Sequence, residues 1–364
     1  MMALNCSISG KMVNSSQHII TTVLLPKNGH IMQIGITGCA GFLGSHLVDT
    51  VLYRGHKVIG IDNLSMGKIE NIEHNLKHKN FKFFKVDVRD FERIEDRLQE
   101  SDVIVHLAAY KIPRYGNALE TLIINSHGTH NVLETARRNK IKVVLASTSD
   151  VYGKNPKVPF NEEDDLVIGP STIPRWSYAA SKLFDEHLSF AYQEEYNIPV
   201  VNIRLFGSYG PRHHLSWWGG PQSVFISQIL NGEEISIHGD GKQTRSFTYV
   251  SDTIDGIVAA LEKDEANGQI FNIGSNYEIT ILDLANLLGK LCNDLFNTSN
   301  ELKLSFIPYS SISNKKYEDV RRRVPDVTKA KQILGFEPKV GLEEGLTKSI
   351  KWQKQVLDIP KPTL

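Results

Sequence analysis

The amino-acid sequence predicts an α/β fold built on a doubly wound parallel sheet. Up to about residue 205, short apolar segments alternate with longer segments in which apolar residues recur at a helical period. A glycine-rich turn joins the first apolar segment to the first amphipathic one. Strands that alternate with helices pair in parallel, and the helices then cover both faces of the sheet.

The expected strands are short runs in which aliphatic or aromatic residues predominate. They lie at 31–37, 57–62, 81–86, 103–107, 142–147 and 200–204. Amphipathic patterns predict helices in the gaps, notably at 42–54, 118–139 and 176–196. Gly55 stands where the first helix should end, since glycine is favoured just past a helix C-terminus.

Proline, glycine and histidine cluster after about residue 205, which indicates a change of domain. We expect a dinucleotide-binding domain over 31–204 and a smaller, mainly substrate-binding domain over 205–364, with some segments of the latter returning to the sheet. Because Met32 stands at the start of the first strand, residues 1–30 are expected to be a disordered extension or an overlong gene start.

The composition is that expected of a cytoplasmic enzyme. The 364 residues include 41 acidic and 41 basic side chains, whereas nucleic-acid-binding proteins usually carry a basic excess. No apolar run reaches the roughly 18 residues typical of a membrane span. Cys6, Cys39 and Cys292 lack metal-ligand spacing and predict reduced thiols. We therefore expect no nucleic-acid partner, no membrane association and no metal.

The glycine turn predicts a dinucleotide site. Gly38, Gly41 and Gly44 stand between the first strand and the first helix. Glycines there permit a sharp turn, a close approach of the backbone to a pyrophosphate, and tight packing of helix on sheet. Asp62 ends the next strand, about twenty residues on, where a carboxylate accepts both ribose hydroxyls of NAD. An unphosphorylated 2′-hydroxyl suits that carboxylate, so we expect NAD rather than NADP.

Tyr178 and Lys182 form a second signal, on the helix expected at 176–196. Four residues make about one helical turn, so both side chains lie on the same face. A phenol with an ordinary pKa near 10 is a poor base, but a neighbouring ammonium and the positive ring of an oxidised nicotinamide both favour the phenolate. Together with the glycine turn, this pair indicates a redox enzyme that acts on hydroxyl groups.

Ordered motifs along most of the chain are similar to those of one family. They are Thr37 to Gly44, Asp62-Asn63-Leu64-Ser65, Asp87-Val88, His106 to Ala109, Asn125 with Gly128-Thr129, Ser147 to Gly153, Tyr178 with Lys182, Arg204-Leu205-Phe206, Gly239 to Phe247, Tyr249 with Asp252, Phe271 to Gly274, and Pro325-Asp326 with Lys329-Ala330. From about residue 31 to about 350 the sequence resembles the extended short-chain dehydrogenase/reductase family of nucleotide-sugar epimerases, decarboxylases and dehydratases. The resemblance implies a Rossmann-type sheet, bound NAD, a nucleotide-diphosphate sugar as substrate, and a homodimer formed through helices such as 118–139 and 176–196.

The resemblance places the NAD-binding residues at the ends of the strands. It implies that the pyrophosphate is bound by Gly38, Gly41 and Gly44, the adenosine ribose by Asp62, and the adenine by Asp87 and Val88. The other residues expected to bind NAD are Phe42, Leu43, Asn63, Ser65, Leu107, Ala108, Ala109, Asn125, Tyr178 and Lys182.

The resemblance also implies the chemistry of the sugar site. Thr148 would hydrogen-bond the sugar 4-hydroxyl, Tyr178 would remove its proton, and Lys182 would bind the nicotinamide ribose and lower the Tyr178 pKa. Hydride then moves from C4 to NAD⁺, which leaves a 4-ketose. Arg245 and Arg323 would neutralise the diphosphate. The expected catalytic residues are Tyr178, Lys182, Thr148 and Asp150, and the expected substrate-binding residues are Lys111, Thr148, Ser149, Arg212, Arg245 and Arg323.

Several reactions share the 4-ketose and differ in the fate of that intermediate. We expect a 4-epimerase first, a UDP-glucuronate decarboxylase second and a 4,6-dehydratase third, and the alternative outside enzymes is a protein that only binds NAD or a nucleotide sugar. Ser149 replaces the acid that dehydratases carry. The run 147–153 and the pair Arg175-Trp176 resemble decarboxylases, although Asp150 is one methylene shorter than their glutamate and reaches about 1.5 Å less far.

Two further features depart from the family pattern. Gly207 replaces an asparagine, so one polar contact to the nucleotide sugar is lost or moved. The segment 213–218, rich in histidine and tryptophan, forms with Lys111, Arg114 and Arg212 a wall that reads a sugar carboxylate or ring, or else serves as a lid or dimer contact. Its two adjacent histidines have no acid or thiol spaced to help them, so they do not predict a zinc site.

Overall fold

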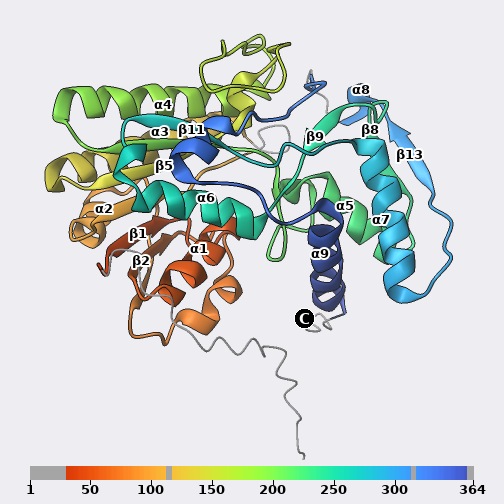
Figure 1. The fold of residues 1–364 in the computed structure, drawn as a ribbon, viewed down its shortest axis with the longest axis horizontal. Coiled ribbons are helices and arrows are strands. Elements are labelled where there is room, and N and C mark those ends of the chain that lie inside the picture. Colours follow the sequence, from red (N-terminus) through yellow and green to blue (C-terminus); the bar gives the residue numbers. More distant parts are fainter. Residues whose placement is uncertain (1–29, 112–116, 313–316, 359–364) are drawn as a thin grey trace, which may run out of the picture.

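The computed structural model describes residues 30–111, 117–312 and 317–358 (Figure 1). Residues 1–29 of the expected extension, which include Cys6, lie outside the described residues, as does Arg114. A layered α/β body forms one side of the molecule, and a smaller group of helices and short strands lies beside it (Figure 1).

Seven parallel strands form the central sheet, in the order β11-β6-β5-β4-β1-β2-β3. Their bounds are β1 Gln33–Thr37, β2 Lys57–Asp62, β3 Phe81–Lys85, β4 Val103–His106, β5 Lys142–Thr148, β6 Val200–Leu205 and β11 Gln269–Ile273. The chain progresses from β1 to β3 in one direction and from β4 to β11 in the other, so the sheet has a switch point between β1 and β4. The doubly wound fold class predicted from the sequence is confirmed.

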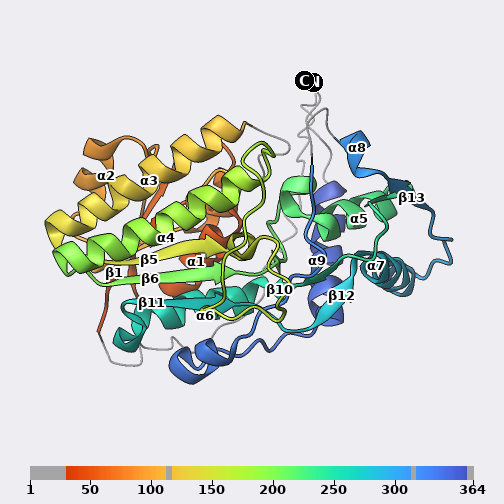
Figure 2. The ribbon, with the colours of Figure 1, turned by 90° about the horizontal axis from the view of Figure 1, so that it is seen from above.

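Helices cover both faces of the sheet (Figure 2). One face carries α1 Phe42–Tyr53 and α6 Val250–Glu262, and the other carries α2 Phe91–Leu98, α3 Ala118–Asn139 and α4 Trp176–Tyr196. Successive side chains of a strand point to opposite faces. On β2, Val58 accordingly packs into the core with α1 and α6, whereas Ile59 packs into the core with α2 and α3.

Element bounds agree with the sequence to within two residues in the sheet body. α3 and α4 have the bounds expected, β1 begins at Gln33, and β5 continues one residue further than expected, to Thr148. Gly55 has a φ of +84°, the left-handed conformation that follows the end of α1. The longer β5 brings Thr148 to the edge of the sheet, where the candidate site lies.

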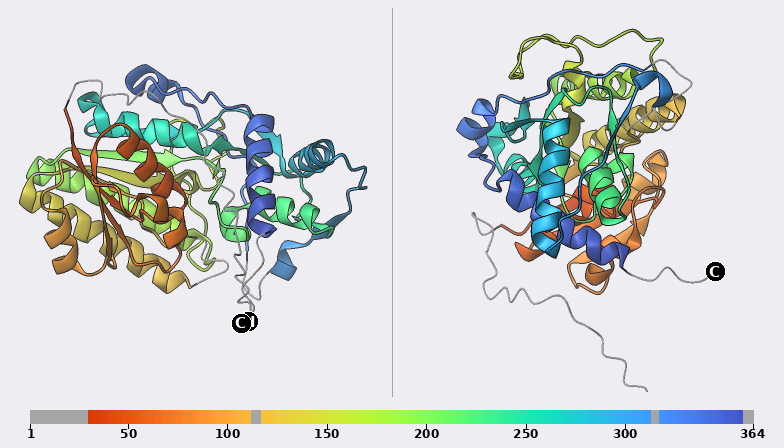
Figure 3. Two further views of the ribbon diagram at one scale, coloured as in Figure 1. Left: turned by 90° about the horizontal axis from the view of Figure 1, so that it is seen from below. Right: turned by 90° about the vertical axis from the view of Figure 1, so that its right-hand side faces the viewer.

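The smaller group is built from the chain after β6. Its helices are α5 Pro221–Leu230, α7 Ile281–Phe296, α8 Tyr309–Ile312 and α9 Leu342–Leu357, and α5, α7 and α9 pack together (Figure 3). Its strands pair as β7 Ser208–Tyr209 with β10 Thr248–Tyr249, β9 Thr244–Ser246 with β12 Glu278–Thr280, and β8 Ile235–His238 with β13 Leu304–Ile307. β11 and α6 return to the large sheet, while the division into domains at residues 204 and 205 stays a prediction.

The described cysteines are structural. Cys39 and Cys292 are free and buried, and Cys39 packs against Gly60 beneath the glycine turn. Its small side chain therefore fills the space between the turn and β2. Among the residues that the structure describes, no helix has both the length and the apolar character needed to cross a membrane.

Candidate active site

A cavity of about 1170 Å³ lies at the carboxyl ends of the parallel strands. The glycine turn, the end of β5 and Tyr178 line one side, and parts of 205–222 and 243–247, with Asp319 and Arg323, line the other. Ligands of doubly wound sheets gather at this edge, near the switch point. Because a single drug-sized ligand fills roughly 300–1,000 Å³, the cavity has room for more than one such ligand.

The glycine turn forms a tight backbone cradle at one end of the cavity. A Cβ atom on Gly44 would lie 2.0 Å from the Gly38 carbonyl oxygen, and one on Gly38, whose φ is +73°, would lie 2.8 Å from the Ala108 nitrogen. The turn leads directly into α1, whose free N–H groups face the cavity together with Gly41, Phe42 and Leu43. These residues fit the pyrophosphate of a dinucleotide, as the sequence predicted.

Asp62, at the end of β2, is fixed by backbone donors. Its carboxylate accepts hydrogen bonds from the nitrogens of Ala40, at 3.0 Å, and of Leu64, at 2.8 Å. Burial raises its pKa, and these two bonds oppose the rise. Each carboxylate oxygen keeps a second lone pair, so the side chain can still accept the ribose hydroxyls expected there.

A polar chain connects the ends of β2 and β3. Asn63 donates to Asp87 at 2.9 Å and accepts from the Ser65 hydroxyl at 2.7 Å. Hydrogen bonds from Arg89 hold the pKa of Asp87 well below its usual range. The structure therefore brings Asn63, Ser65 and Asp87 together at the ends of β2 and β3. They are not among the residues that line the cavity, and their contacts with NAD stay predictions.

The end of β4 forms the floor between the two halves of the site. Leu107 and Ala109 line the cavity, and the Ala108 nitrogen donates to the Thr37 hydroxyl at 3.3 Å. Asn125 is buried and does not line the cavity, because its amide bonds the Tyr110 backbone and, at 2.9 Å, the Ser181 hydroxyl.

Val88 is also buried, against the face of α3 that carries Gly128. Like Asn125, it does not line the cavity. The contacts of Val88 and Asn125 with NAD stay predictions, and in the described structure both residues hold neighbouring segments together.

Thr148 and Tyr178 meet at the end of β5. Thr148 caps the short 3₁₀ turn Ser149–Tyr152 by accepting from the Asp150 nitrogen at 3.2 Å. Burial and then the charge of Asp150 raise the Tyr178 pKa, whereas the hydrogen bond with Thr148 lowers it. Lys182 was expected to lower this pKa, but its ammonium is paired with Asp185, at 3.0 Å.

Three arginines, Arg175, Arg245 and Arg323, converge in the wall of the cavity beyond the end of β5 and form what we call the arginine cluster. Arg323 lies 2.6 Å and Arg175 3.3 Å from Asp150. Asp319 accepts from Arg245 at 2.8 Å and from Arg175 at 3.2 Å. The cluster therefore brings three positive charges against two carboxylates, which leaves one positive charge in excess.

Asp150 is anionic at neutral pH because of this cluster. Burial alone would raise its pKa, but the charges of Arg323, Arg175 and Arg245 outweigh burial and hold the pKa below its usual value. A permanently charged carboxylate thus stands two residues beyond Thr148. Ser149, between them, is buried and lines the cavity.

The histidine- and tryptophan-rich segment closes the cavity from the side of α1. His213 stacks on Phe42 with ring centroids 4.2 Å apart, and Trp217 stacks on His238 at 4.0 Å. Trp218 meets the edge of Tyr110 at 5.4 Å. These contacts join the segment to the glycine turn on one side and to β8 on the other, so it forms a wall of the cavity.

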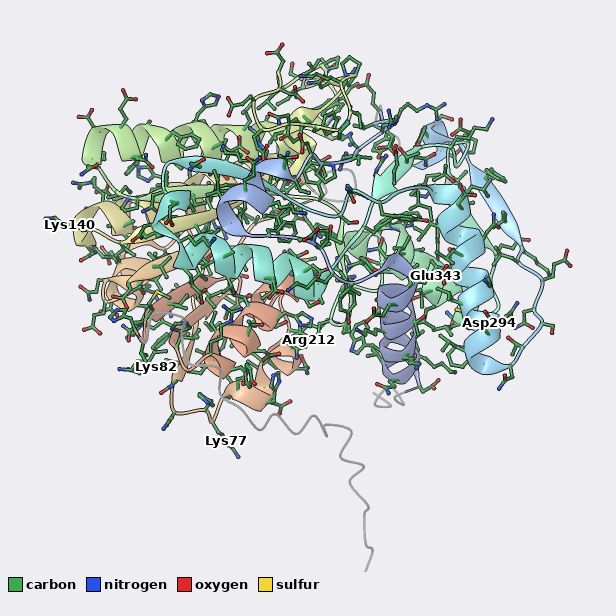
Figure 4. All side chains as sticks on the ribbon, viewed as in Figure 1. Lys77, Lys82, Lys140, Arg212, Asp294 and Glu343 are labelled. Atoms are coloured by element: carbon green, nitrogen blue, oxygen red, sulfur yellow. The ribbon has the colours of Figure 1, made fainter. Side chains whose placement is uncertain are left out.

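The two cations expected beside this wall differ in their surroundings. Lys111 is exposed and lines the cavity. Arg212, which is labelled in Figure 4, lines the cavity too, but its guanidinium pairs with Asp49 of α1 at 2.7 Å. Substrate contacts by Lys111 and Arg212 stay predictions.

Gly207 departs from the family asparagine for a steric reason. Its φ is +45°, and a Cβ atom there would lie 2.2 Å from the Ser246 carbonyl oxygen. The close approach of 207 to β9 therefore requires glycine. A side chain at this position would push apart two segments that line the cavity.

Arg175 and Asp319 are the site residues that sequence reasoning did not select. Arg175 was noticed only as part of an Arg-Trp motif, and nothing in the spacing of Asp319 marks it. Both become site residues because the chain around 317–323 folds over the end of β5. The one signal in the sequence is that Glu318 and Asp319 stand just before the basic run that ends in Arg323.

The protein has an open parallel sheet, with a dinucleotide cradle at one end of its cavity and a surplus of guanidinium charge at the other. NAD-dependent nucleotide-sugar enzymes have this arrangement. The family model described as GDP-mannose 4,6 dehydratase matches residues 36–349, and the chain belongs to this family.

The chain is similar to enzymes that act on uronates. A UDP-N-acetyl-alpha-D-glucosaminuronate decarboxylase from Bacillus cytotoxicus is 36% identical over 323 residues, which cover 88% of this chain and 97% of the relative. UDP-glucuronic acid decarboxylase 1 from Xenopus tropicalis is 37% identical over 91% of this chain and 76% of its own.

A solved structure shows the same fold with its ligands. UDP-glucuronic acid 4-epimerase from Bacillus cereus, in complex with UDP-glucuronic acid and NAD, has a TM-score of 0.76 and 32% identity over 89% of this chain and 100% of that chain. The predicted membership of the nucleotide-sugar epimerase, decarboxylase and dehydratase family, the enzyme class and the cofactor NAD are confirmed.

We predict that Gly44→Ala lowers the affinity for NAD at least tenfold, about 1.4 kcal/mol. The added Cβ would lie 2.0 Å from the Gly38 carbonyl oxygen and must force the turn away from α1. Calorimetric titration with NAD measures the change. Gly341→Ala is the control, because nothing lies within 4 Å of its Cβ position. Wild-type affinity in a folded Gly44→Ala variant would contradict the prediction.

Proposed function

We propose that the protein is a UDP-uronate decarboxylase, which oxidises C4 of the sugar and then releases the C6 carboxyl group as carbon dioxide. The observation that carries the proposal is the arginine cluster around Asp150, directly beyond Thr148. Sequence reasoning placed 4-epimerisation first, but relatives that are 36% and 37% identical and are named as decarboxylases favour the second alternative. The 4-epimerase remains the second candidate, because a similar structure is that of a UDP-glucuronic acid 4-epimerase.

The first step removes a proton and a hydride from the same carbinol. Tyr178 accepts the proton of the 4-hydroxyl, and Thr148, in contact with the Tyr178 phenol, orients that hydroxyl. Bound NAD would supply the redox chemistry, as the acceptor of the C4 hydride and later as its donor. Burial raises the Tyr178 pKa, so the phenol retains the proton once it has accepted it.

The ketone at C4 makes the uronate a β-keto acid. The C5–C6 bond then breaks, carbon dioxide leaves, and the bonding electrons move to the C4 oxygen as an enolate. The protonated Tyr178 and the Thr148 hydroxyl donate to that oxygen, which stabilises the developing charge. A proton from solvent water is added at C5. Return of the hydride to C4 and of the Tyr178 proton to O4 would then complete a pentose.

The arginine cluster suits a substrate with two anionic groups. We assign Arg175 and Arg323 to the sugar carboxylate, because both lie beside Asp150. We assign Arg245, further along the cavity wall, to the diphosphate. The negative charge of Asp150 repels the sugar carboxylate that Arg175 and Arg323 bind. The carboxylate charge, which is lost when carbon dioxide leaves, is therefore destabilised before the C5–C6 bond breaks.

The NAD-binding residues keep the roles that the sequence implied, as proposals. The glycine turn receives the pyrophosphate, Asp62 the adenosine ribose, Asp87 the adenine, and Lys182 the nicotinamide ribose. The cytoplasmic location expected from the sequence also stays a prediction.

A second copy of the chain is the partner we propose for the outer face of α3 and α4. These helices pack side by side (Figures 1 and 2). Leu119, Leu122 and Ile123 of α3 and Phe184 of α4 are 62%, 40%, 37% and 52% exposed. Exposed apolar groups of this kind mark protein interfaces, and two copies of one helix pair can bury them around a twofold axis.

Product analysis tests the reaction. With UDP-glucuronate and UDP-N-acetylglucosaminuronate as separate substrates, we expect NMR to show a UDP-pentose and carbon dioxide in equal amounts from one of them. A uronate inverted at C4 would establish the epimerase instead. A 4-keto-6-deoxy sugar from UDP-glucose would indicate the dehydratase, and no turnover of any nucleotide sugar would favour a binding protein.

Tyr178→Phe is expected to reduce kcat between about a hundredfold and ten-thousandfold, the range for loss of a general base. NAD should remain bound, because the glycine turn is untouched. Steady-state kinetics and the nicotinamide content of the purified protein measure the two effects. Tyr196→Phe, on an exposed part of the same helix, is the matched control. Full activity of Tyr178→Phe would remove this residue as the base.

Phe184→Asp is expected to convert a dimer into a monomer, since it places a charge in the proposed interface. Sedimentation velocity at one protein concentration measures the change. Phe306→Asp is the control, because Phe306 is 50% exposed on β13, away from α3 and α4. A monomeric wild type, or a Phe184→Asp variant that stays dimeric, would refute this interface.

A further inference from the structure

Lys182 is buried, although Tyr178, one turn before it, lines the cavity. The Lys182 side chain is 2% exposed, and its Nζ lies 3.0 Å from Oδ2 of Asp185, whose side chain has no exposed surface. The two residues stand three positions apart on α4. Both charges are removed from water and are in contact, so they form a tight ion pair. Removing either partner would leave the other charge buried and unpaired, which would destabilise the fold.

The ring of His106, at the end of β4, adds no charge to this pair. Its Nδ1 lies 2.7 Å from the Thr37 hydroxyl. Burial, and after it the charge of Lys182, lowers the pKa of His106 to about 3. The imidazole is therefore neutral at physiological pH, and Lys182 obtains no counterion from it.

The next carboxylate on α4 is engaged elsewhere. Glu186 pairs with Arg204 of β6, at 2.9 Å. On α3, the neighbour of Asp185 is the uncharged Thr129. Asp185 is thus the carboxylate that balances Lys182, and the pair as a whole has no net charge.

Tyr178 experiences the charge of Asp185, the acidic member of the pair. Burial raises the Tyr178 pKa, the charge of Asp150 raises it next, Thr148 opposes the rise, and Asp185 adds to it. An ammonium without a counterion would favour the phenolate. Since the carboxylate of Asp185 cancels the charge of the Lys182 ammonium, it reduces the amount by which Lys182 can lower the Tyr178 pKa.

We propose that Asp185 is a positioning residue that fixes Lys182 on the inner side of α4 and neutralises its charge toward Tyr178 and the nicotinamide ring of NAD. The proposal rests on the assignment of Tyr178 and Lys182 made above, but it holds for each of the reactions that begin with oxidation at C4. It matters because the ring of NAD⁺ carries a positive charge that NADH lacks. A bare ammonium near the ring would favour NADH, whereas a neutral pair favours neither form.

The ratio of the dissociation constants of NAD⁺ and NADH tests this proposal without a sugar substrate. Contacts with the ribose and phosphates are common to both forms, so the ratio isolates the charge. Asp185→Asn keeps the size of the side chain and leaves Lys182 without its counterion. We expect the ratio to shift about tenfold toward NADH, the order expected for one unit charge at close range in a partly screened site.

Two variants serve as controls for the ratio. Asp185→Glu retains a carboxylate and should keep the ratio within about twofold of wild type. Glu262→Gln breaks another partly buried ion pair, with Arg54 at 2.9 Å, and should leave the ratio unchanged. An unchanged ratio in folded Asp185→Asn overturns the proposal. If Asp185→Asn does not fold, Asp185→Ser must show the same shift of the ratio. An unshifted ratio in Asp185→Ser would also overturn the proposal.

The pH dependence of hydride transfer gives a second measurement. Single-turnover reduction of bound NAD, with any nucleotide sugar that the enzyme oxidises, reports the protonation of Tyr178. Removing the negative charge of Asp185 lowers the pKa of the phenol, so in Asp185→Asn the rising limb of the profile should move to lower pH by about one unit. If Asp185→Asn reacts more slowly but the rising limb of its pH profile stays at the wild-type pH, Asp185 only supports the structure, and the proposal is overturned.

Discussion

A buried ion pair between Glu186 of α4 and Arg204 of β6 holds the helix that carries Tyr178 and Lys182 against the sheet. The two side chains are 3% and 4% exposed, and their nearest nitrogen and oxygen are 2.9 Å apart. Ser147 of β5 donates to the same carboxylate, and Arg204 also bonds the Tyr152 hydroxyl at 3.0 Å. A buried pair is tolerable only when its remaining donors and acceptors are satisfied. This network joins α4, β6, β5 and the 3₁₀ turn Ser149–Tyr152, and so fixes the rotation of α4 and the start of the segment 147–150 together.

Charge is distributed differently at the two ends of the cavity. Next to Tyr178 on α4, Lys182 and Asp185 cancel each other, and the neighbouring His106 is held neutral by burial. Beyond the end of β5, the arginine cluster exceeds its two carboxylates by one positive charge. A nucleotide-diphosphate uronate is anionic at both its diphosphate and its carboxylate. The positive surplus therefore suits the uronate substrate that we propose, whereas the Lys182–Asp185 pair adds no net charge.

Local chemistry explains which sequence expectations were confirmed. The glycine turn, the bounds of α3 and α4 and the left-handed Gly55 follow from patterns within one element, and the structure has them all. The spacing of Tyr178 and Lys182 was equally visible, but the partner of Lys182 was not. Asp185 stands three residues further on, a spacing that on an exposed helix means an ordinary surface pair. Only the packing of α4 against α3 and the sheet shows that this pair is buried.

The sequence by itself determined the doubly wound sheet, the dinucleotide cradle and the class of substrate, because periodicity, glycine positions and ordered motifs each act over a short stretch of chain. The tertiary structure decided the charges that act on the sugar. Arg175, Arg245 and Arg323 come from three distant segments, and Asp319 belongs to the same segment as Arg323. They meet only because the chain after β6 folds over the end of β5. Electrostatic interactions depend on distance in space rather than along the chain, so their balance could be established only once those segments were in place.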